Sequence, residues 1–149
     1  MNNNLNKSCY LGDHENYKTG VLCLFCKSFS NTMKLYKIPN QQCTDHILYI
    51  LGEALKISKS VYNVEQFTLC IDLKSCNFSD VNREFIISMV KQVQLAFPEK
   101  LKICYMHNPP AILKYIYSII RLIVDKRTLK KFVIIKDNKI VSNQDYLLN

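Results

Sequence analysis

Two cysteines near the start of the chain have the spacing of a metal-binding or redox motif. Cys23 and Cys26 are separated by two residues, the interval found in zinc sites and in redox-active dithiols. They stand, however, in the apolar run 21–26, which predicts a buried strand. Residues three apart on a strand point to opposite faces of the sheet, which suits neither a shared metal ion nor a disulfide. We therefore predict no metal site, and we expect the seven cysteines to be reduced thiols.

The other reactive side chains do not form a recognisable active site in the sequence. His14, His46 and His107 are scattered, and only His107, at a strand end beside Asn108, is placed to line a pocket. Asp72 also ends a strand, where α/β enzymes often hold a catalytic group, but one carboxylate is not a mechanism. With 3 glycines in the chain there is no glycine-rich phosphate loop. The sequence thus predicts a protein that is not an enzyme and needs no cofactor.

The elements that must position these residues alternate between strands and helices. This alternation predicts an α/β fold with a mainly parallel sheet of four to five strands and helices packed on it. The expected strands are residues 21–26, 33–38, 67–73, 101–106 and 132–135, with a hairpin through Asp137-Asn138 to residues 140–141. The expected helices begin at Thr44 or Asp45, at Ser79 or Asp80, and at Pro109. A single domain is expected over residues 18–149, after a polar N-terminal tail over residues 1–17.

Two of the expected helices have pronounced apolar faces. The helix that ends at Pro98 carries the stripe Phe85, Ile86, Met89, Val90, Val93 and Phe97, which we expect to be buried. The segment 111–124 is interrupted only by Lys114, Ser118 and Arg121, which fall on one narrow stripe, so its apolar arc covers about two-thirds of the circumference. Packing on one sheet face needs an arc of about 100° or somewhat more. The surplus predicts contact with a bound apolar ligand or a membrane interface, rather than with another protein layer.

Positive charge is concentrated beside that segment. Residues 100–149 hold ten Lys and Arg against three acidic residues, whereas residues 1–99 hold ten against nine. Lys126, Arg127 and Lys130 directly follow the apolar segment, as in segments that dock on anionic lipid. We therefore predict that these three residues dock the protein on a membrane surface. A solvated basic face without a partner is an equal alternative, and nucleic-acid binding is less favoured because no aromatic platform accompanies the charge.

The sequence predicts neither a secretion signal nor a membrane-spanning segment. Residues 1–6 are polar and rich in Asn, without the apolar run of a secretion signal. The apolar segment 111–124 is too short to span a bilayer. We expect a cytoplasmic protein that associates peripherally with membranes.

Three stretches in the second half of the chain resemble the CRAL-TRIO family of lipid-binding proteins, which includes phosphatidylinositol transfer proteins. They are residues 97–102, residues 105–110 and residues 130–135, and the strand end at 69–74 also fits the family pattern. The resemblance extends over about residues 62–136, half of the chain, in the family's order and spacing. It implies a CRAL-TRIO-like lipid-binding domain that lacks the N-terminal helical lobe.

The resemblance also implies a role for particular residues. Segment 111–124 corresponds to the family's gate helix, whose apolar side chains would contact lipid tails. These are Ile112, Tyr115, Ile116, Ile119, Ile120 and Ile123. Glu99 and Lys131 match the Glu and Lys that recognise the inositol headgroup in phosphatidylinositol-binding members. The implied function is to bind a hydrophobic ligand, a phospholipid such as phosphatidylinositol, and to dock transiently on membranes for lipid transfer or lipid sensing.

The sequence departs from the family pattern at several positions, and two other interpretations stay open. Ser75 stands where the family often has Gly, Pro109 replaces a small residue, and Leu122 and Lys126 replace prolines. Such a trimmed member could be a protein-interaction module whose apolar helix packs on a partner or on a second copy of the chain. The third interpretation is a regulator resembling STAS domains, with Ser75 or Ser79 as a phosphorylation site.

Overall fold

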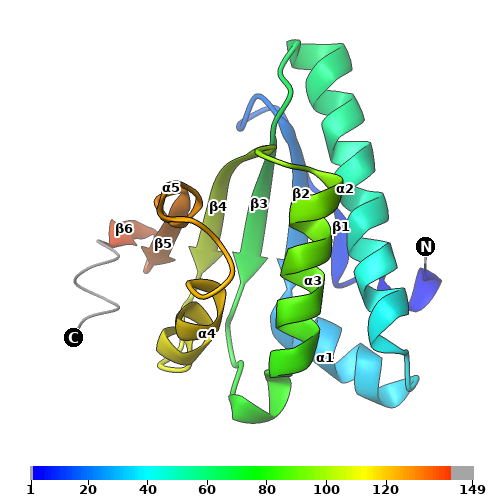
Figure 1. The fold of residues 1–149 in the computed structure, drawn as a ribbon, viewed down its shortest axis with the longest axis vertical. Helices are drawn as coiled ribbons and strands as arrows, with labels where there is room; N and C mark the ends of the chain where they lie inside the picture. Colours follow the sequence, from blue (N-terminus) through cyan, green and yellow to red (C-terminus); the bar gives the residue numbers. More distant parts are fainter. Residues whose placement is uncertain (1, 142–149) are drawn as a thin grey trace.

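The computed structural model describes residues 2–141 and has one sheet of six strands (Figure 1). In chain order they are β1 (Cys9–Leu11), β2 (Gly20–Phe25), β3 (Phe67–Asp72), β4 (Leu101–His107), β5 (Phe132–Lys136) and β6 (Lys139–Val141). Strands β2 to β5 are parallel, and β1 and β6 pair antiparallel at the two edges. The predicted mainly parallel α/β fold is confirmed. So is the final hairpin, in which Asp137 and Asn138 both adopt the positive φ that a tight turn requires.

The helices lie on one face of this sheet. They are α1 (Cys26–Leu35), α2 (Asn40–Tyr62), α3 (Arg83–Ala96), α4 (Leu113–Ile120) and α5 (Lys126–Leu129), with short 3₁₀ turns η1 (Asn3–Leu5) and η2 (Phe78–Asp80). Parallel strands that neighbour each other in chain order need crossovers, and crossovers of the same hand place every helix on the same side. Figure 1 shows the helices in front of the strands. The other face of the sheet has no helix on it within residues 2–141.

The strand expected over residues 33–38 is wrong, because this region belongs to helix α1 and the turn after it. Cys26, Phe29, Ser30 and Met33 recur at intervals of three and four residues, the period of one helix face. Phe29 and Ser30 are buried on that face, and Met33 packs against the core. Six residues of mixed polarity were too short a window to separate the two periods.

Residues 1–17, expected to be a polar tail, fold onto the domain instead as far as they are described. Leu5 and Cys9 are fully buried, and β1 extends the sheet beside β2. Their few apolar side chains fill the space between α2 and the sheet edge. The buried ring of His46 fixes this segment: its Nδ1 accepts a hydrogen bond from the Asn2 amide (3.3 Å), and its Nε2 donates to the Cys9 carbonyl (2.9 Å).

Lowering the pH should destabilise the fold through His46. Burial lowers the pKa of this imidazole, although its bond to the Cys9 carbonyl opposes the shift. A proton on Nδ1 would also face the Asn2 amide, which is itself a donor. Because the folded pKa lies below the unfolded value of about 6.5, the free energy of unfolding should fall as the pH drops through that value towards the folded pKa. Urea unfolding at several pH values checks this, and the His46→Gln variant should show a flatter dependence; an equal slope in both proteins would contradict it.

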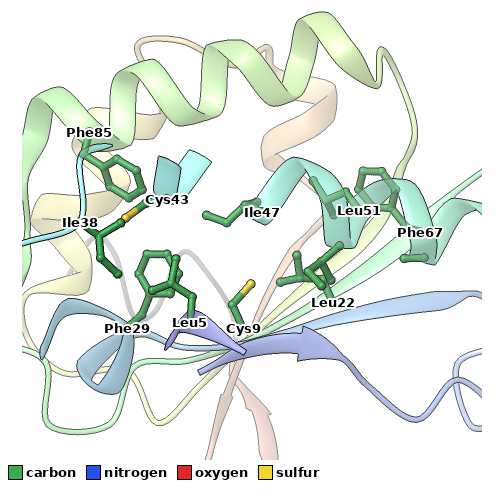
Figure 2. Close-up of a cluster of buried hydrophobic side chains, with 12 residues drawn as sticks. Leu5, Cys9, Leu22, Phe29, Ile38, Cys43, Ile47, Leu51, Phe67 and Phe85 are labelled. Atoms are coloured by element: carbon green, nitrogen blue, oxygen red, sulfur yellow. The ribbon is translucent and has the colours of Figure 1, made fainter. Parts of the chain in front are cut away.

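The buried side chains form two clusters, and α3 contributes Phe85 to the larger one. The larger cluster lies between α1, α2 and strands β1 to β3, and Figure 2 shows it around Leu22, Ile47 and Leu51. The smaller one lies under α4, around Leu113 and Ile134. Of the apolar stripe of α3, only Phe85 is buried. The prediction that the whole stripe is buried is therefore wrong: its other side chains are only partly buried, Met89, Val93 and Phe97 pack against the larger cluster, and all of them line a cavity.

Candidate ligand-binding cavity

A cavity of about 960 Å³ lies between the sheet and the helices. This is at the upper end of the range for small-molecule sites, about 300–1,000 Å³. Its floor is made by alternate strand residues that point to the helical side and lie next to one another in register, in two rows across the parallel strands. One row is Leu22, Leu69, Cys104 and Phe132, and the other holds Leu24, Ile71 and Met106. The floor is thus almost wholly apolar.

Helix α3 forms the long wall of the cavity. Ile86, Met89, Val90, Val93 and Phe97 all line it, while Phe29 and Ile47 contribute from α1 and α2. At 1.5 Å per residue, the 14 residues of α3 extend about 21 Å. Apolar residues follow the whole of this length on one side. The space is therefore long and apolar, a shape suited to hydrocarbon chains.

The helix expected over residues 109–124 is shorter in the structure. Helix α4 spans Leu113–Ile120, and the amides of Leu122 and Ile123 bond to carbonyls only three residues back, which tightens its end into a 3₁₀ turn. Asp125 then starts a separate helix, α5, because its carboxylate accepts from the Thr128 amide (2.7 Å) and caps it. The chain therefore turns between the apolar segment and the basic one.

The structure separates the six residues predicted to contact lipid tails. Ile116 and Ile120 line the cavity. Ile112 and Ile119 are buried elsewhere, and Ile123 is half-buried away from the cavity wall. Tyr115 is exposed and lies against Phe78, with their ring centroids 5.7 Å apart. The stripe of Lys114, Ser118 and Arg121 is exposed, as expected.

Glu99 and Lys131, the two predicted headgroup residues, both line the same end of the cavity. Glu99 lies in the turn between α3 and β4 with a left-handed φ of 57°, and it forms an ion pair with Arg127 of α5. Lys131 is half-buried and donates to the Leu101 carbonyl (2.7 Å). Arg127, predicted to dock on a membrane, thus belongs to this polar end. Lys126 and Lys130 remain exposed on and beside α5.

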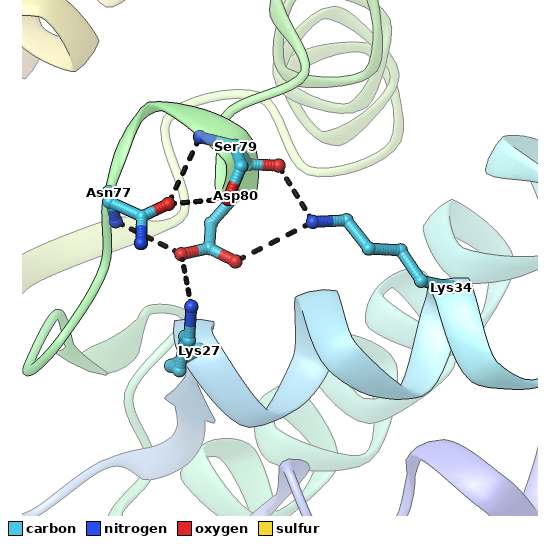
Figure 3. A network of polar contacts seen from close by, with 5 residues as sticks. All are labelled: Lys27, Lys34, Asn77, Ser79 and Asp80. Carbon is cyan, nitrogen blue, oxygen red and sulfur yellow. Dashed lines mark hydrogen bonds and ion pairs between the residues drawn. The ribbon is translucent and has the colours of Figure 1, made fainter.

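The opposite end of the cavity carries an ion-pair network around a buried carboxylate, which the sequence analysis did not find (Figure 3). The Asp80 side chain is 2% exposed, pairs with Lys27 (3.0 Å) and Lys34 (3.8 Å), and accepts from the Asn77 amide (3.0 Å). Burial pushes the pKa of Asp80 up, but the bonds from Asn77 and Lys27 outweigh it and hold the pKa below its usual range. The network ties η2 to α1 at this end of the cavity.

The other residues that the sequence singled out as reactive do not form a catalytic site in the cavity. His14 bonds to the Tyr62 hydroxyl (2.6 Å), and Asp72 accepts from the Lys74 amide (2.9 Å) and from Asn108 (3.3 Å). His107 lies on β4 facing away from the cavity. Within residues 2–141 no three His, Cys, Asp or Glu side chains are grouped to hold a metal ion. None of the helices in this part of the chain has the length and apolar character to cross a bilayer.

Comparison with known proteins decides the family. The family model of the CRAL/TRIO domain matches residues 6–147, nearly the whole chain. The chain belongs to the CRAL/TRIO domain family. This membership covers the N-terminal segment as well as the half of the chain in which the motifs were found, and it sets aside the STAS-like interpretation.

A curated protein and a solved structure are similar to this chain. The chain is similar to the phosphatidylinositol transfer protein SFH5 of Candida glabrata, with 34% identity over 68 residues, 46% of this chain and 20% of that protein. The crystal structure of Sfh5 has the same fold, with a TM-score of 0.70 and 21% sequence identity over 90% of this chain and 49% of that one. The chain thus spans a fifth of the curated relative and about half of the solved one.

Proposed function

We propose that this CRAL/TRIO domain binds one phospholipid and carries it, without chemical change, between membranes or to a sensor. The observation that supports this most is the apolar cavity of about 960 Å³, which carries charged groups at both ends. The Asp80 carboxylate at one end is already paired with Lys27 and Lys34, so we place the headgroup of an amphipathic ligand at the other end, at Glu99 and Lys131, and its acyl chains along α3. The relative named a phosphatidylinositol transfer protein supports the same class of ligand.

The chemistry of the cavity end at Glu99 and Lys131 favours an inositol phospholipid. Lys131 and Lys100 line the cavity there and supply cations for a phosphate. The Glu99 carboxylate can accept hydrogen bonds from ring hydroxyls. Its present partner is Arg127, and an exposed ion pair of this kind is worth only about 0–1 kcal/mol. A headgroup can therefore displace Arg127 at little cost and leave it free to bind the phosphate.

Docking on a membrane would use the turn between α4 and α5. Leu122 is 70% exposed there, between the exposed Arg121 and Lys126, the first residue of α5. An exposed apolar side chain with cations nearby in the chain is typical of segments that insert into an anionic lipid surface. Ile120 lies about half a helical turn from Leu122 and Ile116 just under two turns, so this edge of the cavity would face the bilayer. The same proposal places the protein in the cytoplasm, peripherally bound to membranes.

Native mass spectrometry of the chain purified from eukaryotic cells tests the proposal. We expect one phospholipid per protein, with phosphatidylinositol enriched over its share of the cellular lipid. The Glu99→Ala and Lys131→Ala variants should lose at least about tenfold in phosphatidylinositol relative to other lipids, because each removes one headgroup contact worth about 1.5–3 kcal/mol. Lys56→Ala is the control, since the Lys56 side chain is 76% exposed on α2 and does not line the cavity.

Three outcomes would contradict parts of this proposal. Phospholipid without enrichment of phosphatidylinositol, unchanged in the variants, would refute the headgroup assignment alone. An empty monomer that takes up no lipid from vesicles would refute lipid binding. An empty dimer that dissociates when Leu122 is replaced by Asp would favour the protein-interaction module.

A further inference from the structure

The helix-free face of the sheet holds a pair of cysteines. Cys23 of β2 and Cys70 of β3 lie directly opposite each other in register. Their neighbours Leu22, Leu24, Leu69 and Ile71 point to the cavity, so by strand alternation the two thiols point to the other face. Both cysteines are partly exposed. Adjacent strands lie about 4.8 Å apart, within the Cα separation of about 4.4–6.8 Å that a disulfide bridges.

Polar and aromatic side chains from three segments surround this pair. The side chains of Cys23, Tyr17 and His107 lie around the Cys70 sulfur, and hydrogen bonding from each of them lowers the pKa of Cys70. Tyr105 lies between the last two, with ring centroids 5.8 Å from Tyr17 and 6.5 Å from His107. Asp72 follows Cys70 on the same face of β3. The arrangement converges on one sulfur atom, that of Cys70.

The two thiols are not equivalent. Hydrogen bonds, that of Cys23 first, lower the pKa of Cys70 to about 6, although burial opposes the shift. The same bond raises the pKa of Cys23. Gly12 also covers Cys23, because a Cβ built on Gly12 would lie 2.4 Å from its sulfur. These shifts favour the thiolate at Cys70 and the protonated thiol at Cys23.

We propose that Cys70 and Cys23 form a peroxide-reactive thiol pair, a modification site on the opposite face of the sheet from the ligand cavity. The Cys70 sulfur attacks one oxygen of a hydroperoxide, the O–O bond breaks, and the departing oxygen takes up a proton to leave as water or an alcohol. Cys70 is then a sulfenic acid. The Cys23 sulfur attacks it, the S–O bond breaks, and water leaves with the Cys23 proton. The two thiols lose two electrons in forming the disulfide, and the hydroperoxide gains two.

A second hydrogen-bonded pair in the chain provides an internal comparison. The Cys26 thiol donates to Cys76, and the pKa of Cys76 is lowered. Cys26 lies in the cavity wall, however, and Cys76 is only 7% exposed. A dissolved hydroperoxide reaches this pair less readily than the pair on the open face. Oxidation should therefore begin at Cys70.

Peptide mass spectrometry of the full chain after limited treatment with hydrogen peroxide tests the proposal. We expect a Cys23–Cys70 disulfide, with the mass of two hydrogen atoms lost, before any other cysteine changes. In Cys23→Ser the Cys70 sulfenic acid should persist and be captured by dimedone, and in Cys70→Ser Cys23 should stay reduced. Cys43→Ser, which removes a buried thiol elsewhere, should behave as the natural chain. First oxidation at Cys26 or Cys76, or oxidation spread evenly over the cysteines, would overturn the proposal.

The pH dependence of alkylation tests whether the neighbouring side chains activate Cys70 or whether its reactivity reflects exposure alone. The rate at which iodoacetamide alkylates Cys70 should rise through pH 6 and level off by neutrality, whereas an ordinary thiol titrates near 8.5. Tyr17→Phe and His107→Asn each remove one donor, so each should move the midpoint upward. A midpoint near 8.5 in the natural chain, unmoved in both variants, would show that the neighbours do not activate Cys70 and would also overturn the proposal.

Discussion

Filling the cavity from α3 should abolish lipid loading and leave the protein folded. In the double variant Met89→Trp and Val93→Trp, two indole rings enter the space in which we place the acyl chains. Enlarging a side chain in a packed core costs about 1–3 kcal/mol, but both residues are only half-buried and face the cavity. We expect the bound phospholipid to fall at least about tenfold, measured by native mass spectrometry, with an unchanged circular dichroism spectrum.

The same helix offers a matched control for this experiment. Leu95 is 84% exposed on the outer side of α3, so Leu95→Trp adds the same ring without entering the cavity. Its lipid loading should equal that of the natural chain. If the double variant carries as much lipid as Leu95→Trp, the ligand lies elsewhere. This test does not involve Glu99 or Lys131, so it separates the location of the lipid from the identity of its headgroup.

Strands β2 to β5 and the β5–β6 hairpin could be predicted because their signals are local. Each strand is an apolar run bounded by a turn residue or by Pro, and the Asp137-Asn138 pair tolerates positive φ. The predicted helix starts were less accurate than the predicted strands. Asn82, not Ser79 or Asp80, caps α3 through its bond to the Phe85 amide (3.0 Å), because Asp80 is occupied in the ion-pair network. Several residues there can cap a helix, and only tertiary contacts select one.

The N-terminal segment and the cavity could not be predicted, for a different reason. Leu5 and Cys9 are isolated apolar residues in a polar stretch, and their burial depends on α2 lying beside them. The α3 stripe has the same pattern whether it packs on side chains or lines an empty space, since both require apolar residues at helical spacing. Periodicity therefore identifies an inward face without showing what that face contacts.

The family resemblance supplied what the patterns did not. Glu99 and Lys131 are separated by 31 residues in the chain, and no spacing rule connects them, but both line one end of the cavity. Ser75, where the family often has Gly, has a φ of 66° in the structure. Gly adopts that left-handed conformation without the steric cost that Ser bears. The motif thus marks a backbone geometry that this chain keeps with a less suitable residue.

Replacing Gly by Ala should change the free energy of unfolding in opposite directions at two positions, Gly20, which packs against helix α2, and Gly52, which lies within it. Gly20 starts β2 against α2, and a Cβ built there would lie 1.8 Å from the Ala54 carbonyl oxygen. The atoms that this Cβ would meet are backbone atoms of Ala54, which cannot rotate away. The Gly20 amide also donates a hydrogen bond to the Ser58 hydroxyl (2.7 Å), so β2 and α2 cannot move apart without losing that contact. We expect Gly20→Ala to lower the free energy of unfolding by about 3 kcal/mol or more, measured by urea denaturation.

Gly52, inside α2, is the control for this prediction. A Cβ there would meet only the Phe97 ring, at 4.0 Å, which is an ordinary contact. Ala is favoured over Gly in a helix interior by about 1 kcal/mol, so Gly52→Ala should stabilise the protein by up to that amount. Equal effects at both positions would mean that β2 and α2 do not touch through Gly20. The close approach of Gly20 to α2 matters for the cavity because it holds α2 against the sheet, which places Ile47 and Leu51 at the cavity wall. Gly20→Ala should therefore also reduce lipid loading, whereas Gly52→Ala should not.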